Sequence, residues 1–160
     1  MGTLPQLIEE DIATFERSLA ELLEKSEAQI ALLIDKGGFL ISQIGNRAQD
    51  DTTTLAALAA ASFAATASIA NLVGETDFDS VYQQGKHFSL LVENVDEHCL
   101  LTVVFKAQVS AGAVKYFAQS TILSVAAQLR SARQRNPQAG LDLAMANLAD
   151  TKPLFTRKQT

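Results

Sequence analysis

The residues that could carry nucleophilic or metal chemistry are few, and none falls in a catalytic spacing. Cys99 is the single cysteine and lies inside the apolar run Cys99–Phe105. A thiol in such a run is expected to be buried and reduced, because a reactive thiolate needs a polar, electropositive setting. His87 and His98 have no cysteine or histidine partner at metal-ligand spacing, and each stands close to a turn. Both histidines are therefore expected at the surface or at a sheet edge.

Patterns for acid–base catalysis and nucleotide binding are also missing. No serine sits between glycines in the way a nucleophile elbow requires. The acidic clusters Glu9–Asp11 and Asp96–Glu97 are typical of a solvated helix start and a solvated turn. The pair Gly37-Gly38 is not followed by a predicted helix, so it does not form a phosphate-binding loop. We predict no catalytic residue, no metal and no cofactor, and hence a protein without its own active site.

Composition narrows the class of partner. Hydrophobic residues make up 48% of the 160 residues and charged residues 19%, which are ordinary values for a globular protein. The formal net charge is -5, and the one basic cluster is Arg130, Arg133 and Arg135, so nucleic acid is not expected as a partner. The acidic start lacks the cationic and apolar pattern of a secretory signal. We expect a cytoplasmic protein.

The period of the apolar residues predicts the elements that must position any site. Expected helices are residues 6–25, a stretch from Asp51 or Thr52 to Gly74, and residues 113–135; expected strands are residues 29–34, 39–44, 78–84, 88–94 and 99–105. The order is αββαβββα. Such an antiparallel layer needs helices on both faces, which is an α+β architecture. We expect residues 1–135 to form the domain and residues 136–160 a linker and tail, with a short helix bearing Leu141, Met145 and Leu148.

The second helix has one side made only of small residues. Ala57, Ala61, Ala64, Ser68 and Asn71 share that face at helical spacing. A face of this kind lets another backbone approach closely, either in the protein's own core or at the surface of a partner. The stretch is also free of charge from Thr52 to Gly74, but it is rich in Ala, Ser and Thr and lacks flanking cations and aromatic anchors. Membrane insertion is therefore not expected.

The third strand, residues 78–84, is the most polar one and is the candidate edge of the sheet. Its residues are Phe78-Asp79-Ser80-Val81-Tyr82-Gln83-Gln84. An edge strand exposes unpaired backbone groups that can pair with a second copy in a symmetric dimer. Alternatively, the edge faces solvent, and the charge of Asp79 alone prevents pairing with another strand. The pattern of residues leaves both interpretations open.

Several local strings in their order resemble the roadblock superfamily, and most closely its bacterial MglB members. The resemblance covers roughly residues 6 to 135. The strings are Leu33-Ile34-Asp35-Lys36-Gly37-Gly38, Leu40-Ile41-Ser42, Asp51-Thr52-Thr53-Thr54-Leu55-Ala56, Leu72-Val73-Gly74-Glu75 with Phe78, Val103-Val104-Phe105 and Ser110-Ala111-Gly112-Ala113-Val114-Lys115. The resemblance implies a roadblock fold: one five-stranded antiparallel sheet with the long second helix on one face and the first and last helices on the other.

The resemblance also implies partners and sites. Such relatives form homodimers in which the second helices lie side by side and the third strands join the sheets, which assigns Phe78, Val81 and Tyr82 to the dimer interface. MglB-like dimers bind one MglA-type Ras-like GTPase around the paired second helices, and Ala57, Ala61, Ala64 and Ser68 match that surface. The segment with Leu141, Met145 and Leu148 would be a second GTPase contact.

The activity implied by the resemblance is stimulation of GTP hydrolysis through the GTPase's own catalytic residues, in control of cell polarity or motility. Arg47, in a loop before the second helix, is the one candidate for an arginine acting in trans. The alternative function is a non-catalytic roadblock scaffold or effector, which would bind its partner without changing hydrolysis. Nucleotide-state preference separates the two functions.

Overall fold

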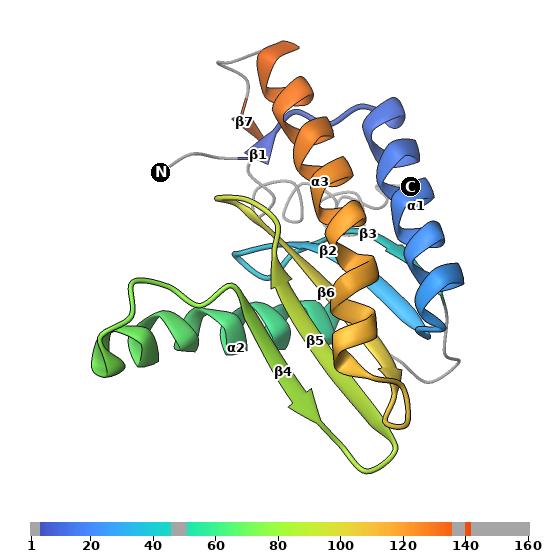
Figure 1. Cartoon of the computed structure of the whole chain (residues 1–160). Helices are drawn as coiled ribbons and strands as arrows, with labels where there is room; N and C mark the ends of the chain where they lie inside the picture. Colours follow the sequence, from blue (N-terminus) through green and yellow to red (C-terminus); the bar gives the residue numbers. More distant parts are fainter. Residues whose placement is uncertain (1–3, 46–50, 136–139, 142–160) are drawn as a thin grey trace, which may run out of the picture.

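The computed structural model describes residues 4–45, 51–135 and 140–141, which form the predicted elements in the predicted order together with two short strands (Figure 1). The helices are α1 (Glu9–Ser26), α2 (Thr52–Val73) and α3 (Ala111–Arg135). The strands are β1 (Leu4–Pro5), β2 (Ile30–Asp35), β3 (Leu40–Ile44), β4 (Ser80–Gln84), β5 (Phe88–Asn94), β6 (Cys99–Lys106) and β7 (Gly140–Leu141). The prediction of an αββαβββα arrangement is confirmed for the main sheet and its helices.

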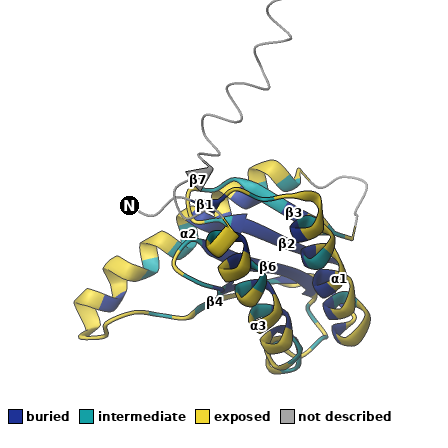
Figure 2. Cartoon of the chain, turned by 90° about the horizontal axis from the view of Figure 1, so that it is seen from above, coloured by how far each residue is buried: buried dark blue, intermediate teal, exposed yellow. Residues whose placement is uncertain are grey.

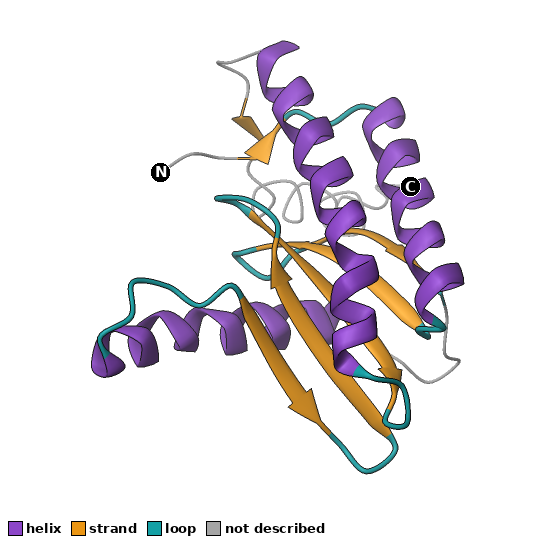
Figure 3. Ribbon diagram, in the orientation of Figure 1, coloured by secondary structure: helices purple, strands orange, loops and turns teal. Residues whose placement is uncertain are grey.

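The main sheet has five antiparallel strands in the order β3-β2-β6-β5-β4, so β4 is an edge strand as predicted. Helices α1 and α3 cover one face, and α2 crosses the other (Figure 3). Strand β6 lies in the middle, and every residue from Cys99 to Phe105 is buried. This double cover explains why β6 has a continuous apolar run without alternation.

Two apolar layers hold the molecule together. On the α1/α3 face, Phe15, Leu19 and Leu22 of α1 and Val114, Val125 and Leu129 of α3 pack on Leu33, Leu101, Val103 and Phe105. On the other face, Ala56, Ala59 and Ala60 of α2 pack on Ile30, Leu32, Ile34, Val92 and Leu100. The alanines let the backbone of α2 come close to the sheet, because they add little side-chain bulk.

Both ends of α2 are capped by the residues that the sequence marks. The Asp51 carboxylate accepts a hydrogen bond from the Thr54 amide at 3.0 Å, and Gly74 ends the helix in the left-handed region with a φ of 80°. The β2–β3 turn fixes the amino-terminal half of α2. An added Cβ on Gly38 would lie 3.1 Å from the Cα of Ala57, so only glycine allows this approach.

The structure corrects three sequence expectations. Strand β4 begins at Ser80 and not at Phe78. Leu141 lies in β7, paired with Leu4, and not in a short helix; Met145 and Leu148 lie outside the described residues, as does Arg47. Asp11 is fully buried although its cluster suggests a solvated helix start. A carboxylate so placed needs hydrogen-bond donors, and Arg135 at the end of α3 supplies them.

Candidate partner-binding surface

The inner face of α2 accounts for its attachment to the sheet. Ala56, Ala59 and Ala60 are buried against the sheet, and Phe63 packs half-buried against the same cluster. These positions follow the stripe that an α-helix turns toward one neighbour. The residues by which α2 packs on the sheet are therefore different from those of the small face identified in the sequence.

The small face lies to one side of the buried stripe and is open in the chain, although the Ala57 backbone lies against Gly38 of the β2–β3 turn. Ala57, Ala61, Ala64 and Ser68 are all exposed. These residues therefore do not pack in the core of this chain, which was the other interpretation that the sequence allowed. Leu58 stands beside them and is 64% exposed, which adds a large apolar side chain to the surface. A flat face of small residues with an apolar border suits close contact with another protein.

The carboxy-terminal half of α2 extends past the sheet (Figure 2). Ala59, Thr66 and Val73 lie on one stripe, about two helical turns apart. Ala59 is buried, Thr66 is half-buried and Val73 is 65% exposed, so exposure increases along this stripe of the helix. Ile69 and Leu72 are exposed as well, Leu72 at 86%. Ala70 is buried near this end, but Ile69, Leu72 and Val73 present apolar side chains to solvent.

The edge strand β4 lies on the side toward which α2 extends (Figure 1). Its residues alternate between the faces of the sheet: Val81 packs toward α2, whereas the Tyr82 ring stacks on Phe105 with centroids 6.2 Å apart. Phe78 precedes the strand and is half-buried. The residues assigned to the dimer interface therefore flank one unpaired edge, with Tyr82 exposed at its middle.

A side-chain hydrogen bond joins helix α2 to strand β4, and a cavity lies between α2 and the segment that precedes β4. The Gln83 amide donates a hydrogen bond to the Ser62 hydroxyl at 3.0 Å. A cavity of about 460 Å³ lies beside Phe63 and is lined by Lys36, Phe63, Asp77, Phe78, Asp79, Asn94, Asp96 and Glu97. The Lys36 ammonium sits 5.9 Å from the centre of the Phe63 ring. Asp96 also accepts hydrogen bonds from the His98 and Cys99 amides, which shape the β5–β6 turn.

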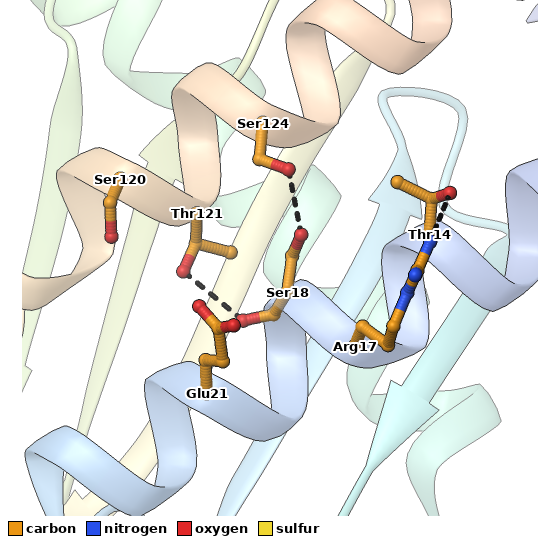
Figure 4. Close-up of a pocket in the computed structure, with 7 residues that line it drawn as sticks. All are labelled: Thr14, Arg17, Ser18, Glu21, Ser120, Thr121 and Ser124. Carbon is orange, nitrogen blue, oxygen red and sulfur yellow. Dashed lines mark hydrogen bonds between the residues drawn. The ribbon is translucent and has the colours of Figure 1, made fainter.

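A second, polar pocket of about 250 Å³ lies between α1 and α3, on the other face of the sheet (Figure 4). Its lining is Thr14, Arg17, Ser18, Glu21, Ser120, Thr121 and Ser124. The hydroxyls are engaged with one another or with backbone: Ser18 and Ser124 lie 2.8 Å apart, and Thr121 donates to the Ser18 carbonyl. The Arg17 guanidinium donates a hydrogen bond to the Thr14 hydroxyl at 3.1 Å. The pocket serves as a hydrogen-bonded seam between the two helices.

Titratable groups in the described residues form no catalytic arrangement. Burial raises the pKa of the Cys99 thiol, which keeps it protonated. Burial also raises the pKa of Glu93, and Asp79 adds to the rise while Lys115 opposes it. His87 is exposed as expected, whereas the His98 side chain is only 15% exposed. Within residues 4–45, 51–135 and 140–141, no group of His, Cys, Asp or Glu side chains could hold a metal ion.

By length and composition alone, α2 could cross a membrane. Its buried alanines, however, join it to the sheet along the amino-terminal half. Insertion into a bilayer would require breaking that contact.

Comparisons with known proteins agree with this geometry. The family profile of the Roadblock/LC7 domain matches residues 14–105. A solved structure described as MglB with tetrameric arrangement superposes with a TM-score of 0.76 at 30% identity, covering 82% of this chain and 99% of that one. The gliding protein MglB from Thermus thermophilus gives a TM-score of 0.75 at 29% identity, over 82% and 99% of the two chains. A comparison with curated protein sequences gives no match.

The Myxococcus xanthus MglB structure is a further relative. It superposes with a TM-score of 0.73 at 29% identity, covering 79% of this chain and 96% of that chain. The matched family region contains most of α1, all of α2 and strands β2 to β6 as far as Phe105. Similarity therefore extends over every element that builds the α2 surface and the β4 edge.

Proposed function

The chain belongs to the Roadblock/LC7 family, and on that premise we propose that it is a GTPase regulator of the MglB type. In this proposal a homodimer binds an MglA-type Ras-like GTPase and stimulates GTP hydrolysis. The catalytic residues belong to the GTPase, and the regulator positions them. The process controlled would be cell polarity or motility, in the cytoplasm.

The observation that carries this proposal is the second, open face of α2. A helix that served only its own fold would turn small residues inward and polar residues outward. Here Ala56, Ala59 and Ala60 already fill the inward role, and yet Ala61 and Ala64 make the outer face small as well. Such a face supports a contact with a partner's backbone and switch loops. Ala57 and Ser68 extend this surface along the helix.

The dimer is supported by two features on one side of the molecule. Strand β4 offers unpaired backbone groups, and the end of α2 offers Ile69, Leu72 and Val73 beyond that edge. A second copy added at β4 would pair with the edge and place its own sheet beneath the overhanging helix. Phe78, Val81 and Tyr82 would then lie at the junction. The segment with Leu141, Met145 and Leu148 is proposed as a second GTPase contact.

The decisive experiment measures single-turnover GTP hydrolysis by a candidate MglA-like GTPase, with and without this protein at two copies per GTPase. Acceleration is expected together with tighter binding to the GTP state than to the GDP state. Equal binding to both states with an unchanged rate would contradict the proposal and identify a scaffold. Binding to the GTP state alone, without acceleration, would identify an effector.

The substitution Ala64→Arg tests the α2 surface directly. Because Ala64 is exposed, the domain should stay folded, with a stability change within about 0.5 kcal/mol. GTPase binding should be lost, since a long charged side chain replaces a methyl group at the contact. Ala127→Arg, at an exposed alanine of α3 on the other side of the sheet, is the matched control. Loss of self-association in Ala64→Arg alone would place Ala64 in the dimer interface.

A further inference from the structure

The two ends of the edge strand β4 carry opposite charge. Asp77 and Asp79 precede the strand, Lys86 follows it, and all three residues are exposed. The strand between them, Ser80–Gln84, has no charged side chain. Backbone hydrogen bonds fix both ends: the Asn94 amide donates to the Asp79 carbonyl at 2.8 Å, and the Ala107 amide to the His87 carbonyl at 2.9 Å. The charge difference is therefore held in place along the edge.

Neighbouring residues modify the charge at both ends. At the acidic end, Glu93 pairs with Ser80 across the sheet and is buried. Its pKa is raised by burial, and Asp79 raises it further, so the carboxylates at this end act on one another. Lys115 lies 3.9 Å from Glu93 and donates to Ser80, and Lys36 lines the same cavity as Asp77 and Asp79, so two cations offset part of the negative charge at this end. At the basic end, Lys106 stands opposite Phe88 in the sheet and adds a second cation beside Lys86.

The overhang of α2 determines how a second copy can pair with β4. Ile69 and Leu72 are exposed on the overhang, and a second copy that presents its own α2 on the same face of the sheet would cover them with a matching apolar helix. Identical subunits with matching faces are related by a two-fold axis perpendicular to the sheet, and that axis makes the two β4 strands antiparallel. The acidic end of each strand then meets the basic end of the other. A parallel pairing would instead bring like charges together.

We propose that Lys86 of one copy pairs with Asp77 and Asp79 of the other, and that this contact, made twice, sets the orientation and register of β4 pairing. With Tyr82 opposite its own symmetry mate, Lys86 falls opposite Phe78, between the two aspartates. An uncharged strand can pair with its copy in more than one register. Charged ends disfavour a shifted register, because the shift separates the opposite charges. This inference rests on the homodimer proposed above and names the groups that specify it.

Reversal of charge at either end tests the contact. The variants are Lys86→Glu and the double variant Asp77→Lys/Asp79→Lys, with Lys25→Glu on α1 as a control for net charge. Sedimentation velocity of the full chain gives the dimer dissociation constant at low and at about 1 M salt, where exposed pairs are screened. Thermal unfolding checks that each variant is folded.

Each reversed variant should have a dissociation constant larger by on the order of tenfold or more at low salt, because repulsion replaces attraction at two symmetric contacts. An equimolar mixture of the two reversed variants should dimerise again, since every facing pair is then complementary. The wild type itself should dissociate more readily as salt rises. Lys25→Glu should leave the constant unchanged.

Two results overturn the inference in different ways. If the wild-type dimer binds more tightly at high salt, or if the reversed variants behave like Lys25→Glu, the proposed charge contact is wrong but the homodimer is not contradicted. If the wild-type chain remains monomeric at every concentration, both the proposed homodimer and the proposed charge contact are wrong. Failure of the inference is therefore distinguishable from failure of the proposed function.

Discussion

Asp11 shows how a single buried carboxylate joins the start of α1 to the end of α3. It caps the first turn of α1 by accepting a hydrogen bond from the Ile8 amide at 2.9 Å. It also accepts from Gln128 at 2.6 Å and from the Arg135 guanidinium at 3.0 Å. Burial alone would raise the pKa of Asp11, but these hydrogen bonds together outweigh it, and the pKa lies below its usual value.

This lowered pKa predicts a loss of stability in acid. A carboxylate with a folded pKa below its unfolded value stabilises the protein above the unfolded pKa, about 4 for Asp, and the gain disappears as pH falls through the folded value. Asp11→Asn should lower the free energy of unfolding at pH 7 by about 1–3 kcal/mol, because the donors around the carboxylate lose their charged acceptor. The difference in the free energy of unfolding between Asp11→Asn and wild type should become smaller below about pH 4.

Thermal unfolding followed by circular dichroism between pH 2 and pH 8, roughly the range over which carboxylates titrate, measures this effect. Glu9→Gln, in the same helical turn but exposed, is the matched control and should change little. A pH-independent gap between wild type and Asp11→Asn would mean that packing, and not the ionised carboxylate, stabilises this site. The sequence could not mark Asp11 out from Glu9 and Glu10, because its partner Arg135 lies at the far end of the chain.

At the scale of elements, periodicity and caps predicted α2 almost to the residue. The stripe of alanines and the capping residues Asp51 and Gly74 act within the helix itself, so they predict its bounds without knowledge of the rest of the fold. The overhang was not predictable in the same way. Val73 belongs by period to the inner stripe, and only the position of the β4 edge leaves it uncovered. That position depends on strand order, which no single segment encodes.

The short strands β1 and β7 were missed for a related reason. Each has two residues, too few to show a period, and they pair across almost the whole chain. Leu4 is nevertheless buried and belongs to the α1/α3 core layer. The expectation of a helix containing Leu141 followed from the spacing of apolar residues, which cannot distinguish a short helix from a strand held by a distant partner.

The overhang predicts that Leu72 contributes to self-association and not to the fold of one chain. Leu72→Ser should raise the dimer dissociation constant by on the order of tenfold, since burying a leucine is worth roughly 1.5–3 kcal/mol. The melting temperature at dilute, monomeric concentration should stay as in wild type. Leu123→Ser is the control, because Leu123 is also a leucine exposed on a helix, at 70%, but on α3. Sedimentation equilibrium gives both constants, and equal values for the two variants would argue against the overhang as an interface.

For the whole molecule, the proposed two-fold axis joins the β4 edges and brings the paired α2 helices to the centre of one face. The small faces with Ala61 and Ala64 then lie around the axis and form a single continuous surface. An asymmetric partner seated across a two-fold axis excludes its own symmetry copy, because both would occupy the same space. Symmetry therefore predicts the composition of the complex with a GTPase.

We expect two copies of this chain for each GTPase, even when the GTPase is in excess. Native mass spectrometry of the mixture with a GTPase locked in its GTP state measures this ratio directly. Ala64→Arg should give the free dimer alone, which shows that the observed complex uses the α2 surface. A complex with two GTPases per dimer would mean that the binding surface lies away from the axis, on the flanks of α2 or on another element. In that case the small face would serve the contact between the two copies, and the position of the GTPase would have to be sought elsewhere on the dimer.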